Sequence, residues 1–251
     1  MIPALVAFDL DDTLAPSKSA LDPSMVPLLQ GLLAATQVCI ISGGQISQFR
    51  AQVLTALEGT DEELLARLHL MPTCGTQYWT FRAGTWHEVY AENLEPEQIE
   101  EAMAVLKASA LSLGLWETHT WGPVLEDRGS QVTFSALGQD APVDAKAAWD
   151  PAGEKKSALR SKVAEALPGL EVRSGGSTSV DVTRLGIDKA YGMTKLRDLT
   201  GIAFGDMLFV GDRLDPDGND FPVIALGIPT RAVGGWTETR DLIAGLLDDA
   251  H

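Results

Sequence analysis

Cysteines and basic residues are scarce in this 251-residue chain, and it has no long apolar run. The two cysteines, Cys39 and Cys74, lack the paired spacing of a zinc knuckle or a disulfide framework, so we expect two reduced thiols. Nineteen Lys and Arg against 35 Asp and Glu give a net charge of −16, which repels nucleic acid and anionic membranes. We therefore expect neither a nucleic-acid nor a membrane partner.

The start of the chain reaches acidic residues after a few apolar ones and has no basic segment before them, so it does not resemble a secretory signal. No apolar stretch approaches the length that crosses a bilayer. We expect a cytoplasmic protein. Because of the net charge, any site for a phosphorylated substrate must be made locally positive by Lys, Arg, a metal ion or helix N-termini.

Hydrophobic residues make up 45% of the chain and charged residues 22%, which is typical of a folded domain. Apolar runs that suit buried strands occur near both ends of the chain, at 4–8, 38–41 and 207–210, with a helical period at 25–33. Between them, 131–136 and 177–182 alternate as half-exposed antiparallel strands do, and 95–113 and 155–167 read as helices. We predict an α/β fold whose parallel-sheet core combines residues 1–83 and 185–251, with an α+β insertion at 84–184.

Acidic residues follow the first predicted strand directly, in the run Asp9-Leu10-Asp11-Asp12-Thr13. Open α/β sheets bind their ligands at the carboxyl ends of strands. If the chain turns at Leu10, Asp9 could attack phosphorus while Asp11 moves a proton. For an isolated run of this kind a solvated acidic turn is the favoured explanation, since Asp is common at strand ends and helix caps.

Three further segments carry groups suited to phosphate or metal chemistry. They are Ser42-Gly43-Gly44 after the second strand, Lys189 at the start of a helix, and Gly211-Asp212 with Asn219-Asp220 after a late strand. A hydroxyl and open backbone N–H groups can hold phosphate oxygens, a lysine can stabilise a phosphoryl group, and carboxylates suit magnesium. Each segment alone also has an ordinary explanation, namely a capping serine, a solvated lysine and a polar turn. Together with the acidic run, and in this order along the chain, they supply a nucleophile, a proton carrier, a phosphate clamp and a metal site.

These segments also carry a family resemblance. DLDDTL, SGG, the lysine of GIDK and GDRLDPDGND resemble the four motifs of the haloacid dehalogenase (HAD) superfamily. Within it the chain is similar to the eukaryotic-type phosphomannomutases, most specifically at GGSTSVDV (175–182) and at 211–220. The resemblance implies a HAD-type Rossmannoid core, an inserted α+β cap that closes over the site, Mg²⁺ as cofactor, a phosphorylated sugar as substrate and possible homodimerisation through the cap.

By position, the resemblance makes Asp9 the nucleophile, Asp11 the acid/base and Lys189 the charge that steadies Asp9 and the phosphoryl group. Magnesium would be held by the side chains of Asp9 and Asp212 and by the main-chain carbonyl of Asp11. Ser42 takes the catalytic position of the second motif. The implied substrate-binding residues are Lys18, which stands where the family has an arginine, Gly43, and the cap residues Arg128, Ser179 and Asp181.

Departures from the family pattern leave open whether the phosphoryl group on Asp9 is passed back to a sugar or to water. Gln139 and Lys146 stand where the family has two further cap arginines, Ser42 precedes its glycine pair, and Asp12 replaces a glycine. Overall similarity favours a mutase that interconverts mannose 1-phosphate and mannose 6-phosphate, whereas the weakened clamp favours a phosphatase. A catalytically silent binding module is disfavoured because all four motif positions retain competent side chains.

Overall fold

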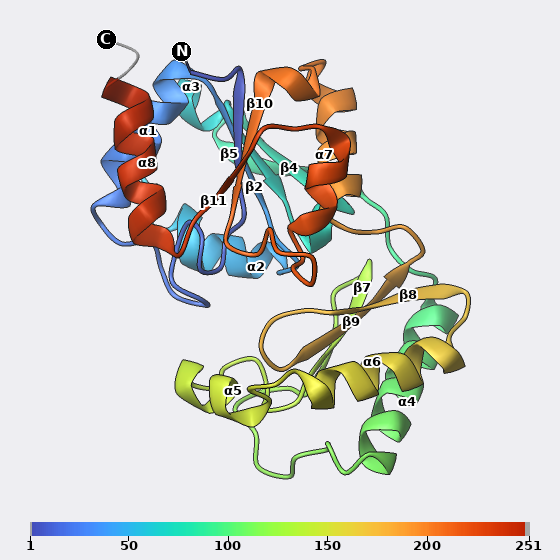
Figure 1. Ribbon diagram of the computed structural model, residues 1–251. Helices are drawn as coiled ribbons and strands as arrows, with labels where there is room; N and C mark the ends of the chain where they lie inside the picture. The colour runs from blue at the N-terminus through green and yellow to red at the C-terminus, as the bar shows by residue number, and fades with distance from the viewer. Residues whose placement is uncertain (1, 249–251) are drawn as a thin grey trace. The chain divides into compact units, whose positions relative to one another are not determined.

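The computed structural model describes residues 2–248, and the chain divides into two compact units (Figure 1). The core unit joins Met1–Ala91 to Asp188–His251, and the inserted unit is Glu92–Ile187. The sequence placed residues 84–91 in the insertion. The boundary differs because β5 (Thr85–Ala91) pairs antiparallel with β4 (Gln77–Arg82) and so extends the core sheet.

The core sheet has seven strands in the order β11-β10-β1-β2-β3-β4-β5. At its centre, β1 (Leu5–Phe8) pairs in parallel with β10 (Met207–Gly211) on one side and with β2 (Gln37–Ile41) on the other. Because parallel strands end at the same edge of a sheet, the residues that follow β1, β2 and β10 are brought together there. The mostly parallel sheet with flanking helices confirms the predicted fold class.

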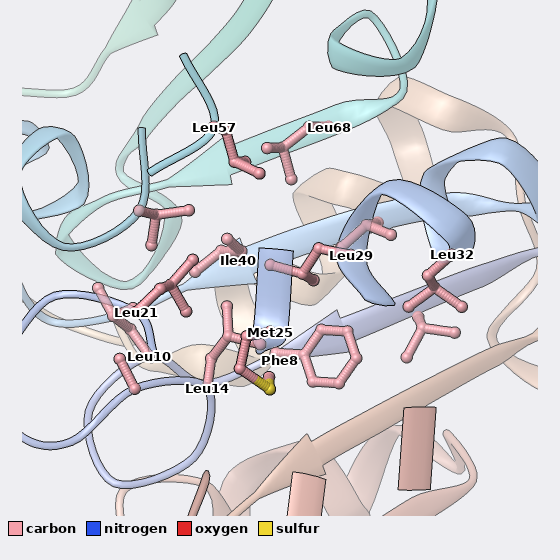
Figure 2. Packing of buried hydrophobic residues seen from close by; sticks show 14 of the residues in the cluster. Phe8, Leu10, Leu14, Leu21, Met25, Leu29, Leu32, Ile40, Leu57 and Leu68 are labelled. Carbon is pink, nitrogen blue, oxygen red and sulfur yellow. The ribbon is translucent and has the colours of Figure 1, made fainter. Parts of the chain in front are cut away.

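Helices cover both faces of this sheet. In Figure 1, α1 (Met25–Ala35) and α8 (Trp236–Asp248) lie on one face and α7 (Lys189–Thr200) on the other. Alternate residues of β1 supply the two faces, since Phe8 packs with the α1 side and Ala7 with the α7 side. Figure 2 shows Phe8 among Met25, Leu29 and Ile40. Each such side chain contributes about 1.5–3 kcal/mol by leaving water.

Short elements complete the core unit. They are α2 (Ile46–Phe49), the π-helix η1 (Arg50–Leu54), α3 (Glu62–Leu65), β3 (Leu68–Met71), the 3₁₀-helices η2 (Thr73–Gly75), η3 (Phe204–Asp206) and η4 (Phe221–Leu226), and β11 (Thr230–Ala232). The apolar run at 223–226 lies within η4.

The inserted unit is a four-stranded antiparallel sheet in the order β6-β7-β9-β8, with helices against it. Its strands are β6 (Leu125–Asp127), β7 (Gln131–Ser135), β8 (Leu170–Ser174) and β9 (Ser179–Arg184), and its helices are α4 (Pro96–Ser112), α5 (Val143–Trp149) and α6 (Glu154–Ala166). Leu106 of α4, Leu159 of α6 and Phe134 of β7 belong to its separate apolar core. The unit thus buries a core of its own.

One sequence-based expectation about this sheet is wrong. The alternating pattern of β7 predicted a solvated polar face, but Gln131, Thr133 and Ser135 are all buried. Their side chains are hydrogen-bonded instead: the Thr133 hydroxyl donates to Asp181 Oδ1 at 2.8 Å, and the Ser135 and Ser179 hydroxyls are 3.2 Å apart. Alternation identifies the two faces of a strand but does not reveal whether the polar face meets water.

Among residues 2–248, no helix combines the length and the apolar character needed to cross a bilayer.

Candidate active site

Asp9 and Lys189 form a buried ion pair at the carboxyl edge of the core sheet. Asp9 continues β1, and its backbone N–H donates to the Val210 carbonyl oxygen at 3.0 Å. Lys189 opens α7, and its fully buried Nζ lies 2.5 Å from Asp9 Oδ1. The Asp188 side chain caps this helix by accepting from the Tyr191 backbone N–H at 2.9 Å. The cap fixes where α7 begins and therefore where Lys189 lies.

Two glycines let α7 approach the sheet edge closely. A Cβ on Gly192 of α7 would lie 2.6 Å from the Cys74 carbonyl oxygen, and a Cβ on Gly75, whose φ is +85°, would lie 2.5 Å from Gly192 Cα. The same turn supports the second motif, because the Cys74 backbone N–H donates to the Ser42 carbonyl oxygen at 2.9 Å. Larger residues would push the helix that carries Lys189 away.

Asp212 and Asp220, which belong to the motif after β10, complete the cluster. Lys189 Nζ also pairs with Asp220, which is fully buried. The second Asp220 oxygen accepts from the Arg213 backbone N–H at 3.1 Å, and Asp212 Oδ1 accepts from the Thr13 hydroxyl at 3.2 Å. The sequence left open whether Asp220 contacts a metal. The structure places it as the second counter-ion of Lys189, aided by Gly211, where a Cβ would collide with the Asp220 carboxylate.

Negative charge exceeds positive charge in this cluster. Oxygens of Asp9, Asp212 and Asp220 lie within 4.8 Å of one another. Burial raises the pKa of Asp9 well above its ordinary value, and the Asp220 charge adds to this while Lys189 opposes it. Burial acts to lower the pKa of Lys189, but the Asp220 and Asp9 charges outweigh it and raise that pKa. Lys189 is therefore an ammonium, and the site carries an excess of carboxylate.

The excess carboxylate fits a hard divalent cation. Oxygen ligands are those that such ions prefer, and the ion's charge would balance the surplus. Because Asp220 already accepts from Lys189 and Arg213, the second oxygen of Asp9 and the Asp212 carboxylate are the better placed donors. Burial also raises the pKa of Asp212, and a bound cation would reverse that effect.

Asp11 is held apart from this cluster by four donors. Its Oδ1 accepts from the Lys18 backbone N–H at 2.8 Å and from Gln52 Nε2 at 3.3 Å. Its Oδ2 accepts from Gln48 Nε2 at 2.8 Å and lies 3.2 Å from Lys18 Nζ. Burial acts to raise the pKa of Asp11, but the Lys18 charge and these hydrogen bonds together lower it. Lys18, expected to bind substrate, thus contacts the expected acid/base.

The second motif forms a tight turn after β2. Ser42 is buried, and its hydroxyl accepts from the Gly44 backbone N–H at 3.1 Å. Its own backbone N–H donates to the Met71 carbonyl oxygen at 3.3 Å. Gly43 lies within this turn. The hydrogen bond from Gly44 is that of a serine turn, and Ser42 does not cap α2, which begins at Ile46 after the N-cap residue Gln45. The two interpretations of this segment are therefore a polar turn and a phosphate-binding turn.

The other expected site residues belong to the inserted unit. Arg128 follows β6, and its guanidinium Nη2 lies 2.7 Å from Glu126 Oε2. Ser179 and Asp181 lie on β9, opposite Ser135 and Thr133 of β7. The sheet therefore gathers Arg128, Ser179 and Asp181 in one unit, whereas Asp9, Asp11, Ser42, Lys189 and Asp212 lie in the other.

Comparison with known proteins agrees with this geometry. The family profile described as "Eukaryotic phosphomannomutase" matches residues 115–239. Phosphomannomutase 1 of Homo sapiens is 25% identical over 228 residues, which cover 88% of this chain and 83% of that protein. The match spans both units of the chain.

Solved structures show the same fold at lower sequence identity. The N-terminally truncated IMP-nucleotidase of Plasmodium falciparum superposes with a TM-score of 0.74 at 15% identity, over 98% of this chain and 70% of that one. A haloacid dehalogenase-like hydrolase from Bacteroides thetaiotaomicron gives a TM-score of 0.64 at 15% identity, over 99% and 100% of the two chains. With the sequence matches, they show a phosphomannomutase-like enzyme that has the fold of haloacid dehalogenase-like hydrolases.

Proposed function

We propose that this enzyme transfers the phosphoryl group of a sugar phosphate through an aspartyl-phosphate on Asp9, with Mg²⁺ as its cofactor, and that it interconverts mannose 1-phosphate and mannose 6-phosphate. The observation that carries the proposal is the buried Lys189 between Asp9 and Asp220 at the carboxyl edge of the sheet. A buried lysine paired with two carboxylates costs desolvation energy, so a packing role alone does not account for it. Such clusters are typical of catalytic sites.

Each core residue has a role in this reaction. Asp9 attacks phosphorus in line, and the bond to the sugar oxygen breaks as the Asp9–phosphorus bond forms. Lys189 stabilises the charge on the phosphoryl oxygens from a site where water cannot screen it. Because the pKa of Asp11 is lowered in the free site, Asp11 must first take up a proton; it then gives that proton to the departing sugar oxygen and later takes one from the next acceptor. The Ser42 hydroxyl, whose hydrogen can still be donated, and the backbone N–H of Gly43 hold phosphoryl oxygens.

The side chains of Asp9 and Asp212, with the main-chain carbonyl of Asp11, would hold Mg²⁺. When bound, the ion supplies positive charge against the phosphoryl oxygens and against the surplus carboxylate of the site.

A phosphatase is the second candidate, and one observation favours it. Gln139 and Lys146, where arginines would strengthen a clamp for the second phosphate, are used within the inserted unit. Gln139 Nε2 donates to the Ser135 hydroxyl at 2.6 Å, and Lys146 Nζ donates to the Gln139 carbonyl oxygen at 2.7 Å. A loosely held sugar phosphate would leave the phosphoenzyme open to water.

One turnover screen separates the two candidates. Hexose 1- and 6-phosphates are incubated with enzyme and Mg²⁺, and both the isomeric product and free phosphate are measured. For a mutase we expect the isomer to accumulate faster than phosphate, with mannose phosphates the best substrates. Phosphate release without isomer would replace the mutase with the phosphatase. The absence of both products for every substrate would remove the proposed function.

Arg128→Ala should lower kcat/KM for mannose phosphates but should not impair cleavage of the phosphate ester bond itself. We propose that the forked guanidinium of Arg128 binds the phosphate that is not transferred, which Gln139 and Lys146 could not replace with equal geometry. Loss of charged hydrogen bonds should lower kcat/KM for mannose 6-phosphate by roughly 10 to 100-fold. Hydrolysis of p-nitrophenyl phosphate, which has no second anchor, should change little.

The matched control for this prediction is Arg160→Ala, since Arg160 is an exposed arginine on α6 of the same unit. It should leave both substrates unaffected. Equal losses for both substrates in a folded Arg128→Ala enzyme would assign Arg128 to the scaffold and contradict the proposed contact.

A further inference from the structure

We infer that Gln48 and Gln52 are positioning residues that aim the Asp11 carboxylate. The inference rests on the proposed function, in which Asp11 transfers the proton, and it adds two residues that no motif includes. They bind different oxygens of the carboxylate: Gln48 Nε2 lies 2.8 Å from Oδ2, and Gln52 Nε2 lies 3.3 Å from Oδ1. Two donors on two oxygens fix both the rotation and the tilt of the carboxylate.

Lys18 links the same residues from a third direction. Its Nζ donates to Gln48 Oε1 at 2.6 Å and lies 3.2 Å from Asp11 Oδ2, so the Gln48 amide is itself held by a charge. The Lys18 side chain is 34% exposed, whereas the Gln52 residue is 3% exposed. The Gln48 amide therefore connects a partly solvated lysine to Asp11 Oδ2, while the buried Gln52 amide holds Asp11 Oδ1.

The backbone that carries the two glutamines is unusual. Gln48 lies on α2, and the chain then widens into the π-helix η1, which contains Gln52. The i→i+5 bond from the Thr55 backbone N–H to the Arg50 carbonyl oxygen is 3.0 Å. Single π-turns inside helices are rare and are frequently found at functional sites. Here the wide turn lies where the two amides reach Asp11.

The environment of Gln52 is consistent with a functional role. Its Nε2 donates to the Ser19 carbonyl oxygen at 2.8 Å as well as to Asp11, so it ties the carboxylate to the loop after it. Its Oε1 is buried and accepts no hydrogen bond from the described protein atoms. A buried amide with an unsatisfied acceptor lowers stability, so the donor side of Gln52 explains its presence better than packing does.

The inference predicts a dependence on the leaving group. A misaimed Asp11 transfers its proton poorly, and the loss matters most where the leaving oxygen is basic. Gln48→Ala should therefore lower kcat/KM, which reports the steps up to departure of the leaving group, by about tenfold or more for phenyl phosphate and mannose 6-phosphate but by less than about threefold for p-nitrophenyl phosphate. General loss of structure would lower all three alike. Gln30→Ala is the matched control, because the Gln30 amide donates to the Thr60 hydroxyl instead.

A double-mutant cycle completes the test. With Asp11 replaced by asparagine, Gln48→Ala should cause no further loss on phenyl phosphate, because a residue that acts through Asp11 has nothing left to position. Gln52→Asn, which shortens the side chain but keeps the amide, should show the same leaving-group pattern as Gln48→Ala. Equal losses on all substrates, or independent effects of Gln48→Ala and Asp11→Asn, would overturn the inference and leave the proposed function intact. No turnover of any phosphate by the wild-type enzyme would overturn both.

Discussion

Asp9→Asn should abolish turnover of every phosphomonoester while leaving the protein folded. An amide has no nucleophilic charge and is a poor ligand for a divalent cation, so both attack and metal binding suffer. Removing a nucleophile from a site whose other residues depend on it costs at least about 10⁴-fold in kcat. Steady-state assays with p-nitrophenyl phosphate and mannose 6-phosphate measure this loss.

The stability of Asp9→Asn carries separate information. Burial raises the pKa of Asp9 even though Lys189 pairs with it, so the charged form of Asp9 is disfavoured in the site without a metal ion. Lys189 keeps Asp220 as its partner in the variant. Without Mg²⁺ the variant should therefore unfold at a temperature equal to or above that of the wild type, and Mg²⁺ should raise that temperature less in the variant than in the wild type.

The control is Asp206→Asn, because Asp206 is exposed and lies before β10, at the opposite edge of the sheet from Asp9. It should keep full activity and the full response to Mg²⁺. Substantial turnover by Asp9→Asn, with the protein pure and folded, would exclude an aspartyl-phosphate on this residue.

The core of this site was predictable because parallel strands end at one edge. Asp9 and Asp212 are 203 positions apart in the sequence, yet each follows a strand whose apolar run can be recognised in the sequence. β1 pairs directly with β10. Lys189 could be placed from the helix it opens. Local periodicity and strand order thus predict the position of the proposed nucleophile, of its lysine partner and of one proposed metal donor.

Other parts of the site depend on information that the sequence pattern does not carry. Gln48 lies just before the π-helix η1 and Gln52 lies within it, and the pattern of apolar residues does not predict a π-turn. The Asp220 carboxylate packs where a Cβ on Gly211 would lie, and its pairing with Lys189 joins segments that are distant in the sequence. The buried polar face of β7 and the addition of β5 to the core sheet likewise depend on what packs against them.

Lys189→Met should combine a loss of activity with a large loss of stability. Methionine fills a similar volume but leaves Asp9 and Asp220 buried without their shared counter-charge. Breaking a buried ion pair from one side costs about 3–5 kcal/mol of unfolding free energy. Urea unfolding of the variant and the wild type in the absence of Mg²⁺ measures the difference.

The control lies on the same helix. Lys195 of α7 lies over the rings of Tyr90 and Tyr191 at 5.5 and 5.4 Å, so Lys195→Met loses cation–π contacts, which contribute about 0.5–1 kcal/mol at exposed sites. It should destabilise far less than Lys189→Met and retain turnover. Equal destabilisation by the two variants would show that burial of the helix, and not the charge of Lys189, is what stabilises this edge.

The pH dependence and a second substitution identify the cause of the instability. A buried carboxyl whose pKa is raised in the folded state takes up a proton before the unfolded chain does, so its destabilising effect shrinks as the pH falls. The stability gap between Lys189→Met and the wild type should therefore narrow from pH 8 to pH 5. Adding Asp220→Asn to Lys189→Met removes one uncompensated charge and should recover part of the lost stability, while turnover stays absent because Asp9 still lacks its cation. If the gap keeps its size at both pH values and the added substitution restores nothing, the cluster is held by packing and the charge balance inferred for it is wrong.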